Sequence, residues 1–241
     1  MEWHIGCSGF HYKHWKGTFY PDDLPQRLWF EYYATHFKTL ELNITFYQFP
    51  KLSVLQQWYQ VAPPGFRFSV KAPRAITHFK QFHDTADMMQ SFYDTIRSGL
   101  LEKLGPVLFQ FPPRFRYEEP RLQRVLDQLD PDFDNVLEFR HPGWWRPDVF
   151  EALGKKRVAF CGMSHPDLPD DVVINAPFVY YRFHGVPQLY SSAYSQTTLQ
   201  KFANQLNTAT NLEQCWCYFN NDAAVAAIAD AKTLIGLTSG N

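Results

Sequence analysis

Hydrophobic residues recur along the chain in short runs, and longer amphipathic stretches separate these runs. β-Branched or aromatic residues dominate most of the runs, and Gly, Pro or Asn bound most of them, as is typical of strands. The strands predicted in this way are His4–Ser8, Leu40–Thr45, Arg67–Lys71, Val107–Phe111, Val136–Arg140, Arg157–Gly162, Phe178–His184 and Cys215–Asn220. Side chains alternate between the two faces of a strand, so each run also predicts which residues share a face.

Helix-like segments lie between most of these strands. They are Gln26–Phe37, Ser53–Val61, Thr85–Gly99, Pro120–Leu129, Pro147–Gly154, Ser195–Asn207 and Asp222–Leu234. Between the sixth and seventh strands, Ser164–Pro177 is rich in proline, which predicts that this helix is missing or reduced to a turn. Strand and helix in alternation predict a parallel sheet that is covered by helices.

The number of strands favours a closed barrel over an open sheet. An open sheet would expose two long edges, and the first strand is not followed by the Gly-x-Gly-x-x-Gly motif of a dinucleotide-binding fold. The length of 241 residues suits one α/β barrel, and no linker or internal repeat divides the chain. We therefore predict a TIM-like (β/α)8 barrel, with one helix missing between strands six and seven, as a single domain over residues 1–241.

Polar residues concentrate at the carboxyl ends of the predicted strands, on the face opposite the apolar residues. They are Glu41, Asn43, Lys71, Gln110, Glu138, Arg140, Arg182, His184 and Asn220. In an α/β barrel the apolar face packs under the helices, and the carboxyl ends of the strands form the mouth that carries active sites. Because burial of ionisable groups is costly, the pattern predicts a polar, mixed-charge site at this mouth.

Composition excludes several classes of function. The net charge is −1 and no basic block is present, which argues against strong electrostatic capture of bulk nucleic acid, although a local phosphate pocket remains compatible. No apolar run is long enough to cross a membrane and the first residues do not resemble a signal peptide, so we expect a cytoplasmic protein. The four cysteines, Cys7, Cys161, Cys215 and Cys217, are expected to be reduced.

Motifs at the strand ends carry a family resemblance. Glu41–Tyr47, Phe68–Lys71 with Ile76–His78, Leu108–Pro113, Glu138–Trp144, Tyr181–Gly185 and Tyr218–Asp222 occur in this order. The opening Ile5–Phe10 also agrees, as do Trp15–Gly17 and Phe19–Pro21. Together they resemble the family called domain of unknown function 72, also termed YecE-like, over essentially the whole chain. The stretch Ala223–Ala227 departs from it by lacking a glycine often found there. The resemblance implies a TIM-like barrel and supplies no activity.

The residue types at the predicted mouth suggest acid–base chemistry on an anion. Glu41, Glu138 and His184 are the catalytic candidates, because carboxylates and imidazole transfer protons near neutral pH. The candidate ligand-binding residues are Asn43, Lys71, Gln110, Arg140, His141, Trp144, Arg182 and Asn220, because arginine matches phosphate or carboxylate and an indole ring can stack on a base or sugar. The alternative, which the sequence supports equally, is that Glu41 and Glu138 each only neutralise a neighbouring arginine or lysine.

A divalent metal is not the favoured cofactor, because a three-metal site needs more acidic residues than these strand ends provide.

The candidate catalytic and anion-binding residues together lead us to expect a hydrolase or lyase that acts on a phosphate-bearing or nucleotide-derived substrate. The alternative is a non-catalytic module that binds an anionic metabolite or the end of a nucleic acid. The expected partners are thus an anionic small molecule or a nucleic-acid fragment and no membrane, while the oligomeric state is open.

Overall fold

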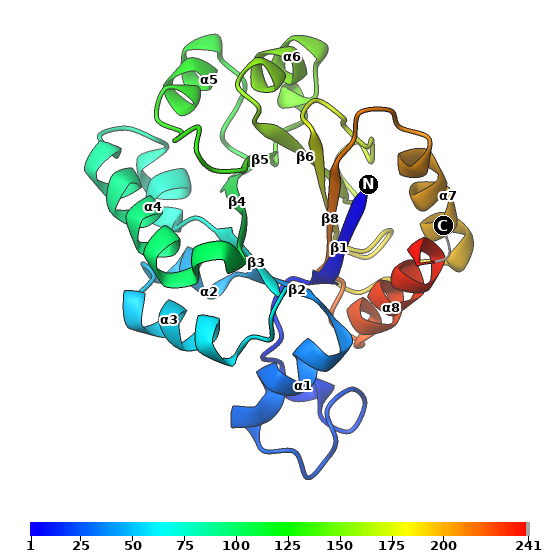
Figure 1. Cartoon of the computed structure of the whole chain (residues 1–241). Coiled ribbons are helices and arrows are strands. Elements are labelled where there is room, and N and C mark those ends of the chain that lie inside the picture. Colours follow the sequence, from blue (N-terminus) through cyan, green and yellow to red (C-terminus); the bar gives the residue numbers. More distant parts are fainter. Residues whose placement is uncertain (240–241) are drawn as a thin grey trace. The chain divides into compact units, whose positions relative to one another are not determined.

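The eight predicted strands all form, and they hydrogen-bond in chain order as a closed barrel, β1-β2-β3-β4-β5-β6-β7-β8. The strands of this computed structural model are β1 (Glu2–Cys7), β2 (Thr39–Leu42), β3 (Arg67–Lys71), β4 (Leu104–Phe111), β5 (Asn135–Phe139), β6 (Ala159–Ser164), β7 (Phe178–Phe183) and β8 (Gln214–Phe219). The structure describes residues 1–239, and the coloured ribbon in Figure 1 follows them through strands and helices. The TIM-like (β/α)8 fold is therefore confirmed.

The seven predicted helices all form, with shifts at their ends, and α2 is an additional helix that was not predicted. They are α1 (Trp29–His36), α2 (Ile44–Tyr47), α3 (Leu52–Val61), α4 (Ala86–Leu100), α5 (Glu119–Leu126), α6 (Pro147–Lys155), α7 (Gln196–Asn207) and α8 (Ala226–Thr238). Proline stands in the first turn of α5 and of α6, where its missing N–H costs nothing. The Oγ of Ser195 accepts a hydrogen bond from Thr198 N at 3.1 Å and caps α7.

The segment between β6 and β7 has no helix, as its prolines predicted. A difference from the prediction lies in the expected strand Leu40–Thr45, which ends at Leu42 and turns into α2. The Oγ1 of Thr45 donates to the carbonyl of Leu42 at 3.0 Å and to that of Lys71 at 2.6 Å, and these bonds hold the helical turn. Period-2 alternation did not reveal this turn, because the apolar residues continue through it.

The chain divides into two compact units. Unit 1 consists of Met1–Glu41, Gly162–Val172 and Pro177–Asn241, and unit 2 of Leu42–Cys161 and Val173–Ala176. In unit 1, α7 and α8 lie side by side, and α8 packs on β1 and β8; in unit 2, α3 and α4 lie side by side (Figure 1). The expectation of a single domain over residues 1–241 stays a prediction, and residues 240–241 lie outside the described part.

Apolar residues of the strands pack under helices in both units. In unit 2, Phe109 on β4 contacts Phe92 and Tyr93 of α4. In unit 1, Phe183 on β7 packs against Phe202 of α7. The face assignment from the sequence is therefore confirmed for these strands, and it leaves the polar residues on the opposite face.

Candidate functional site

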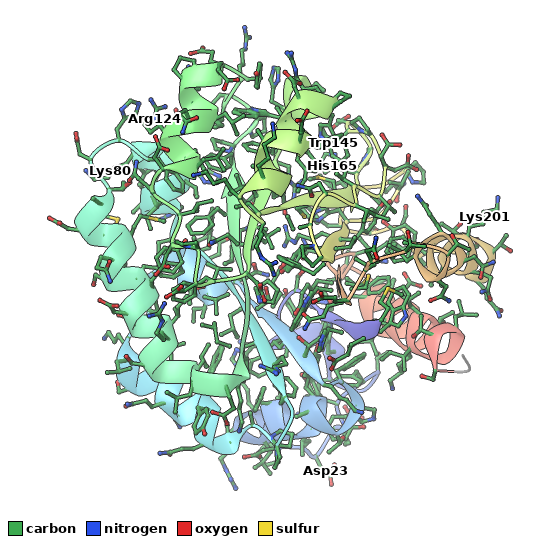
Figure 2. All side chains as sticks on the ribbon, turned by 45° about the horizontal axis from the view of Figure 1, so that its top comes forward. Asp23, Lys80, Arg124, Trp145, His165 and Lys201 are labelled. Carbon is green, nitrogen blue, oxygen red and sulfur yellow. The ribbon has the colours of Figure 1, made fainter. Side chains whose placement is uncertain are left out.

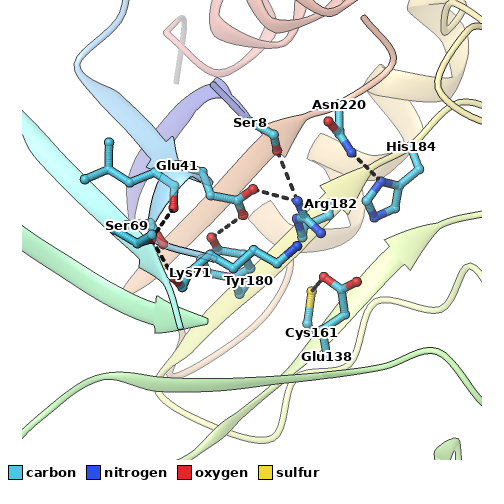
Figure 3. A network of polar contacts seen from close by, with 12 residues as sticks. Ser8, Glu41, Ser69, Lys71, Glu138, Cys161, Tyr180, Arg182, His184 and Asn220 are labelled. Atoms are coloured by element: carbon cyan, nitrogen blue, oxygen red, sulfur yellow. Dashed lines mark hydrogen bonds and ion pairs between the residues drawn. The ribbon is translucent and has the colours of Figure 1, made fainter. Parts of the chain in front are cut away.

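Glu41 in unit 1 is a fully buried carboxylate with two strong hydrogen-bond donors. Nη2 of Arg182 donates to its Oε1 at 2.6 Å, and the phenol of Tyr180 donates to its Oε2 at 2.6 Å (Figure 3). Glu41 is 0% exposed and Arg182 is 2% exposed. The charges of this pair balance, so the arrangement agrees with the charge-neutralising alternative for Glu41.

Tyr180 and Ser8 complete this network of Glu41. Burial raises the pKa of Tyr180 well above its ordinary value, and the carboxylate of Glu41 raises it further, so the phenol keeps its proton and remains a donor. Nη2 of Arg182 also reaches the Oγ of Ser8 at 3.4 Å. Together these contacts hold the guanidinium of Arg182 in one orientation.

His184 and Asn220 follow β7 and β8, which pair in register at Phe183 and Phe219. Nδ2 of Asn220 lies 3.1 Å from Nδ1 of His184 (Figure 3). An amide nitrogen donates, so Nδ1 of His184 is the acceptor in this contact. The structure thus brings together two residues that the sequence predicted only as members of the same strand-end set.

Asp222 in unit 1 is a residue that the sequence analysis assigned to a helix. Its carboxylate instead accepts hydrogen bonds from Nε1 of Trp15 and, at 2.9 Å, from Nε2 of His14. Burial raises the pKa of Asp222, while Trp15 and His14 lower it. The signal in the sequence was its place as the last residue of the strand-end motif Tyr218–Asp222, although the sequence analysis assigned it to the start of a helix.

In unit 2, the polar residues of β3, β4 and β5 share one face. Lys71 pairs with Leu108 in register, and Gln110 pairs with Glu138, so these side chains point to the same side of the sheet. Glu138 is fully buried, and Nε of Arg140 donates to its Oε1. The thiol of Cys161 lies 3.8 Å from Oε2 (Figure 3). A thiol is a weak donor, so this side of Glu138 differs from the phenol-bound side of Glu41.

The ammonium group of Lys71 lies over the face of an aromatic ring. Its Nζ lies 4.2 Å from the ring centre of Phe46 and its side chain is buried. Phe46 belongs to α2, the turn that replaced the end of the predicted second strand. The electron-rich face of the ring attracts the ammonium group, which fixes a positive charge at the carboxyl end of β3.

His78 lies beside this charge, in a π-helical turn over Ala75–Lys80. Its ring meets that of Phe46 edge-on at 4.9 Å. Burial lowers the pKa of His78 to about 4, and the positive charges of Lys71 and Arg114 lower it as well, against the opposing effect of Glu138. The imidazole is therefore neutral at physiological pH.

Other predicted site residues have different surroundings. Trp144 is fully buried, and its ring stacks on Phe139 and Phe115 at 4.0 and 5.4 Å. Nδ1 of His141 accepts from the backbone of Gly143 at 3.0 Å, which caps a short 3-10 turn. Asn43 lies in the helical region between β2 and α2. Trp144 and His141 thus stabilise the loop after β5 through packing and a backbone hydrogen bond.

Within residues 1–239, no group of three or more His, Cys, Asp or Glu side chains is arranged to hold a metal ion. The helices in this range are all too short or too polar to span a bilayer. The four cysteines are free and buried, as expected, with the sulfur atoms of Cys215 and Cys217 3.5 Å apart.

Solved structures with similar folds cover almost the whole chain. A DUF72 family protein from Thermotoga maritima is 25% identical, with a TM-score of 0.90 over 99% of this chain and 100% of the other. A DUF72 family protein from Enterococcus faecalis, 16% identical, has a TM-score of 0.83 over 99% of this chain and 96% of that one. The second likeness shows the fold alone.

Sequence relatives point to the same family. UPF0759 protein YecE of Escherichia coli K12 is 35% identical over 113 residues, which are 46% of this chain and 41% of that protein. UPF0759 protein YunF of Bacillus subtilis is 28% identical over 141 residues, 56% of this chain and 50% of that one. The matched stretches thus span half or less of these relatives. The family model described as "Protein of unknown function DUF72" matches residues 4–240, and the chain therefore belongs to the DUF72 family.

Proposed function

We propose that the strand ends of unit 2 bind a phosphate-bearing or nucleotide-derived small molecule, and that the protein is a hydrolase or lyase acting on it. The observation that carries the proposal is the group of cationic side chains around His78. Nζ of Lys71 lies over the ring of Phe46, whose edge meets the His78 ring at 4.9 Å, and Nη2 of Arg114 donates to the carbonyl of His78 at 3.0 Å. Lys71, Arg114 and Arg74 all lower the pKa of this imidazole, and Glu138 raises it. Several cations beside a neutral ring are a setting that attracts an anion.

Each residue has a role that follows from its contacts. Lys71, fixed against Phe46, and the guanidinium of Arg114 hold the phosphate. The neutral ring of His78 offers it a hydrogen bond, and the bound negative charge raises the pKa of His78. Gln110, next to Glu138 in register, adds an amide that orients the substrate.

Glu138 is the residue that would transfer a proton. It is buried, its position is fixed by Arg140, and it stands on the same face as Lys71. The ion pair with Arg140 is also the observation that favours the alternative function, because a carboxylate held by a guanidinium is a weak base. In that alternative the same residues bind the anion without turnover.

Phosphate binding and phosphate release separate the two functions. We would measure binding of inorganic phosphate by calorimetry, and release of phosphate from a panel of phosphomonoesters. The hydrolase proposal predicts that Glu138→Gln lowers kcat by about 10²- to 10⁴-fold without weakening phosphate binding, because the change removes a negative charge from the site. Lys71→Met should weaken phosphate binding, whereas Lys155→Met, on the exposed side of α6, should leave it unchanged.

Circular dichroism of each variant shows whether it folds. If the protein binds phosphate but no phosphomonoester is turned over, or if Glu138→Gln keeps its rate, the catalytic role of Glu138 fails and the binding function is left. If the wild-type protein does not bind phosphate, both functions fail at this site.

A further inference from the structure

Arg74 lies between two of the most exposed aromatic rings of the described chain. Its guanidinium carbon is 5.5 Å from the ring centre of Tyr47 and 5.3 Å from that of Phe79. Tyr47 is 64% exposed and Phe79 is 67% exposed. Single exposed apolar residues are common, but two exposed rings on either side of one guanidinium form a patch, and exposed patches mark binding sites.

Arg74 differs from the other arginines that lie over rings in unit 2. Those arginines, with the rings and carboxylates they contact, are Arg97 with Phe133 and Asp130, Arg121 with Phe115 and Glu118, and Arg146 with Tyr117 and Asp148. Within residues 1–239, Arg74 makes no ion pair with any carboxylate. Its charge is therefore available to an anion from solution.

Two further cations, Lys80 and Arg114, have hydrogen-bond partners only on the backbone within residues 1–239. Nζ of Lys80 donates to the carbonyl of Asp84 at 3.4 Å, and Nη2 of Arg114 donates to that of His78 at 3.0 Å. Lys80 lies in the turn that leads into α4 and is labelled in Figure 2. Carbonyl partners fix these side chains without neutralising them, so they add to the positive charge of this surface.

The backbone that carries Phe79 and Lys80 is itself unusual. The π-helical turn Ala75–Lys80 is followed by Gln81, Phe82 and Asp84, all with positive φ, at 48°, 62° and 48°. Such conformations are costly for residues other than glycine and tend to occur where function requires them. The fully buried ring of Phe82 anchors the turn against Phe109 and Phe111, which keeps Phe79 exposed on a rigid support.

We propose that Tyr47, Arg74, Phe79, Lys80 and Arg114, together called the aromatic–cationic platform, bind single-stranded nucleic acid. Bases stack on the two exposed rings, whose faces accept any base, and the three cations contact the phosphates. A small-molecule pocket encloses most of its ligand, but both rings are about two-thirds exposed, as suits an extended strand. The inference deepens the proposed function and rests on it, because it names the class of phosphate compound.

The affinity should be local and dependent on salt. The protein as a whole has a net charge of −1, so attraction comes from the platform rather than from the overall field. Three phosphate contacts on a single strand predict a slope of about −2 for log K against log salt concentration.

The test is fluorescence anisotropy of a fluorescein-labelled ten-nucleotide oligothymidine with the full chain, in a series of salt concentrations. Tyr47→Ala and Phe79→Ala should each weaken binding by about 5- to 150-fold, because each removes one stacking surface. Arg74→Gln should weaken binding and make the salt slope shallower by about 0.7. Arg97→Gln is the matched control, because it also removes a cation over a ring, but one that is paired with Asp130. It should leave binding unchanged.

Several outcomes would overturn the inference. They are no binding by the wild-type protein, equal loss in Arg97→Gln and Arg74→Gln, and no effect of the two ring variants. If thymidine monophosphate bound as tightly as the oligonucleotide, the ligand would not be an extended strand. If phosphatidylserine vesicles bound in a ring-dependent way and the oligonucleotide did not bind, the ligand would not be a nucleic acid. Calorimetry with inorganic phosphate distinguishes the proposals: phosphate binding without oligonucleotide binding defeats only this inference, and the reverse result defeats only the proposed function.

Discussion

The strand ends of the two units contain the same kinds of residues in different states of charge balance. In unit 1, Glu41 accepts hydrogen bonds from Arg182 and Tyr180, so one carboxylate meets one cation in a buried network. In unit 2, His78 is surrounded by Lys71, Arg114 and Arg74, with Glu138 as the opposing charge. Unit 1 therefore resembles a structural ion pair, while in unit 2 several cations act on one neutral imidazole.

This difference teaches that residue type alone does not identify a functional carboxylate. Glu41 and Glu138 are both fully buried, and the sequence placed both near the ends of strands. What separates them is the set of donors around each one and the charge of the wider group. A balanced buried pair maintains the fold, and an unbalanced group is a candidate for ligand binding.

The largest effect that tests this comparison is expected from Glu41→Gln. The change leaves the buried guanidinium of Arg182 without its counter-charge, which should lower the free energy of unfolding by about 3–5 kcal/mol. Urea denaturation measures it. The double variant Glu41→Gln with Arg182→Met should recover part of the lost free energy of unfolding. If Glu41→Gln alone lowers the free energy of unfolding by less than about 1 kcal/mol, the pair is not structural.

A smaller effect is expected from Tyr180→Phe. The phenol donates to the charged Oε2 of Glu41 at 2.6 Å, and removal of a hydrogen bond to a charged group costs about 2 kcal/mol. The same denaturation experiment measures this change. Phosphate affinity should stay at the wild-type value, because unit 2 is unchanged, and a loss of phosphate binding in this variant would contradict the comparison.

The smallest effect is a pH dependence that unit 2 should show through His78. Its pKa in the folded protein is about 4, below the ordinary 6.5, so the unfolded chain takes up a proton first as pH falls. The contribution of His78 to stability is therefore present above pH 6.5 and is lost between pH 6.5 and about 4. The difference in unfolding free energy between the wild type and His78→Gln, measured across this range, should decrease toward low pH.

Titration of the His78 ring by NMR checks the cause of that dependence. Saturating phosphate should raise the pKa of His78, because the anion offsets Lys71 and Arg114. A pKa near 6.5 without phosphate, or one that phosphate does not move, would show that Lys71 and Arg114 do not act on this ring as proposed.

Local patterns in the sequence determined much of the fold. Alternation of apolar and polar residues located all eight strands, and the prolines of Ser164–Pro177 predicted the missing helix. The same alternation placed Phe109 under a helix and Glu138 on the opposite face. These features depend on neighbouring residues along the chain, and so a single sequence contains them.

Only the tertiary structure decided which charges meet. The partners Glu41 and Arg182 are 141 residues apart, so their pairing depends on strands that are distant along the chain. The turn at Asn43 ends β2 because Thr45 bonds to the carbonyl of Lys71, 26 residues away, and it thereby places Phe46 over that lysine. The cations around His78 and the position of Arg74 between Tyr47 and Phe79 likewise follow from contacts between distant segments. Electrostatic balance is a sum over neighbours in space, so the sequence specified the charged groups and the fold determined their roles.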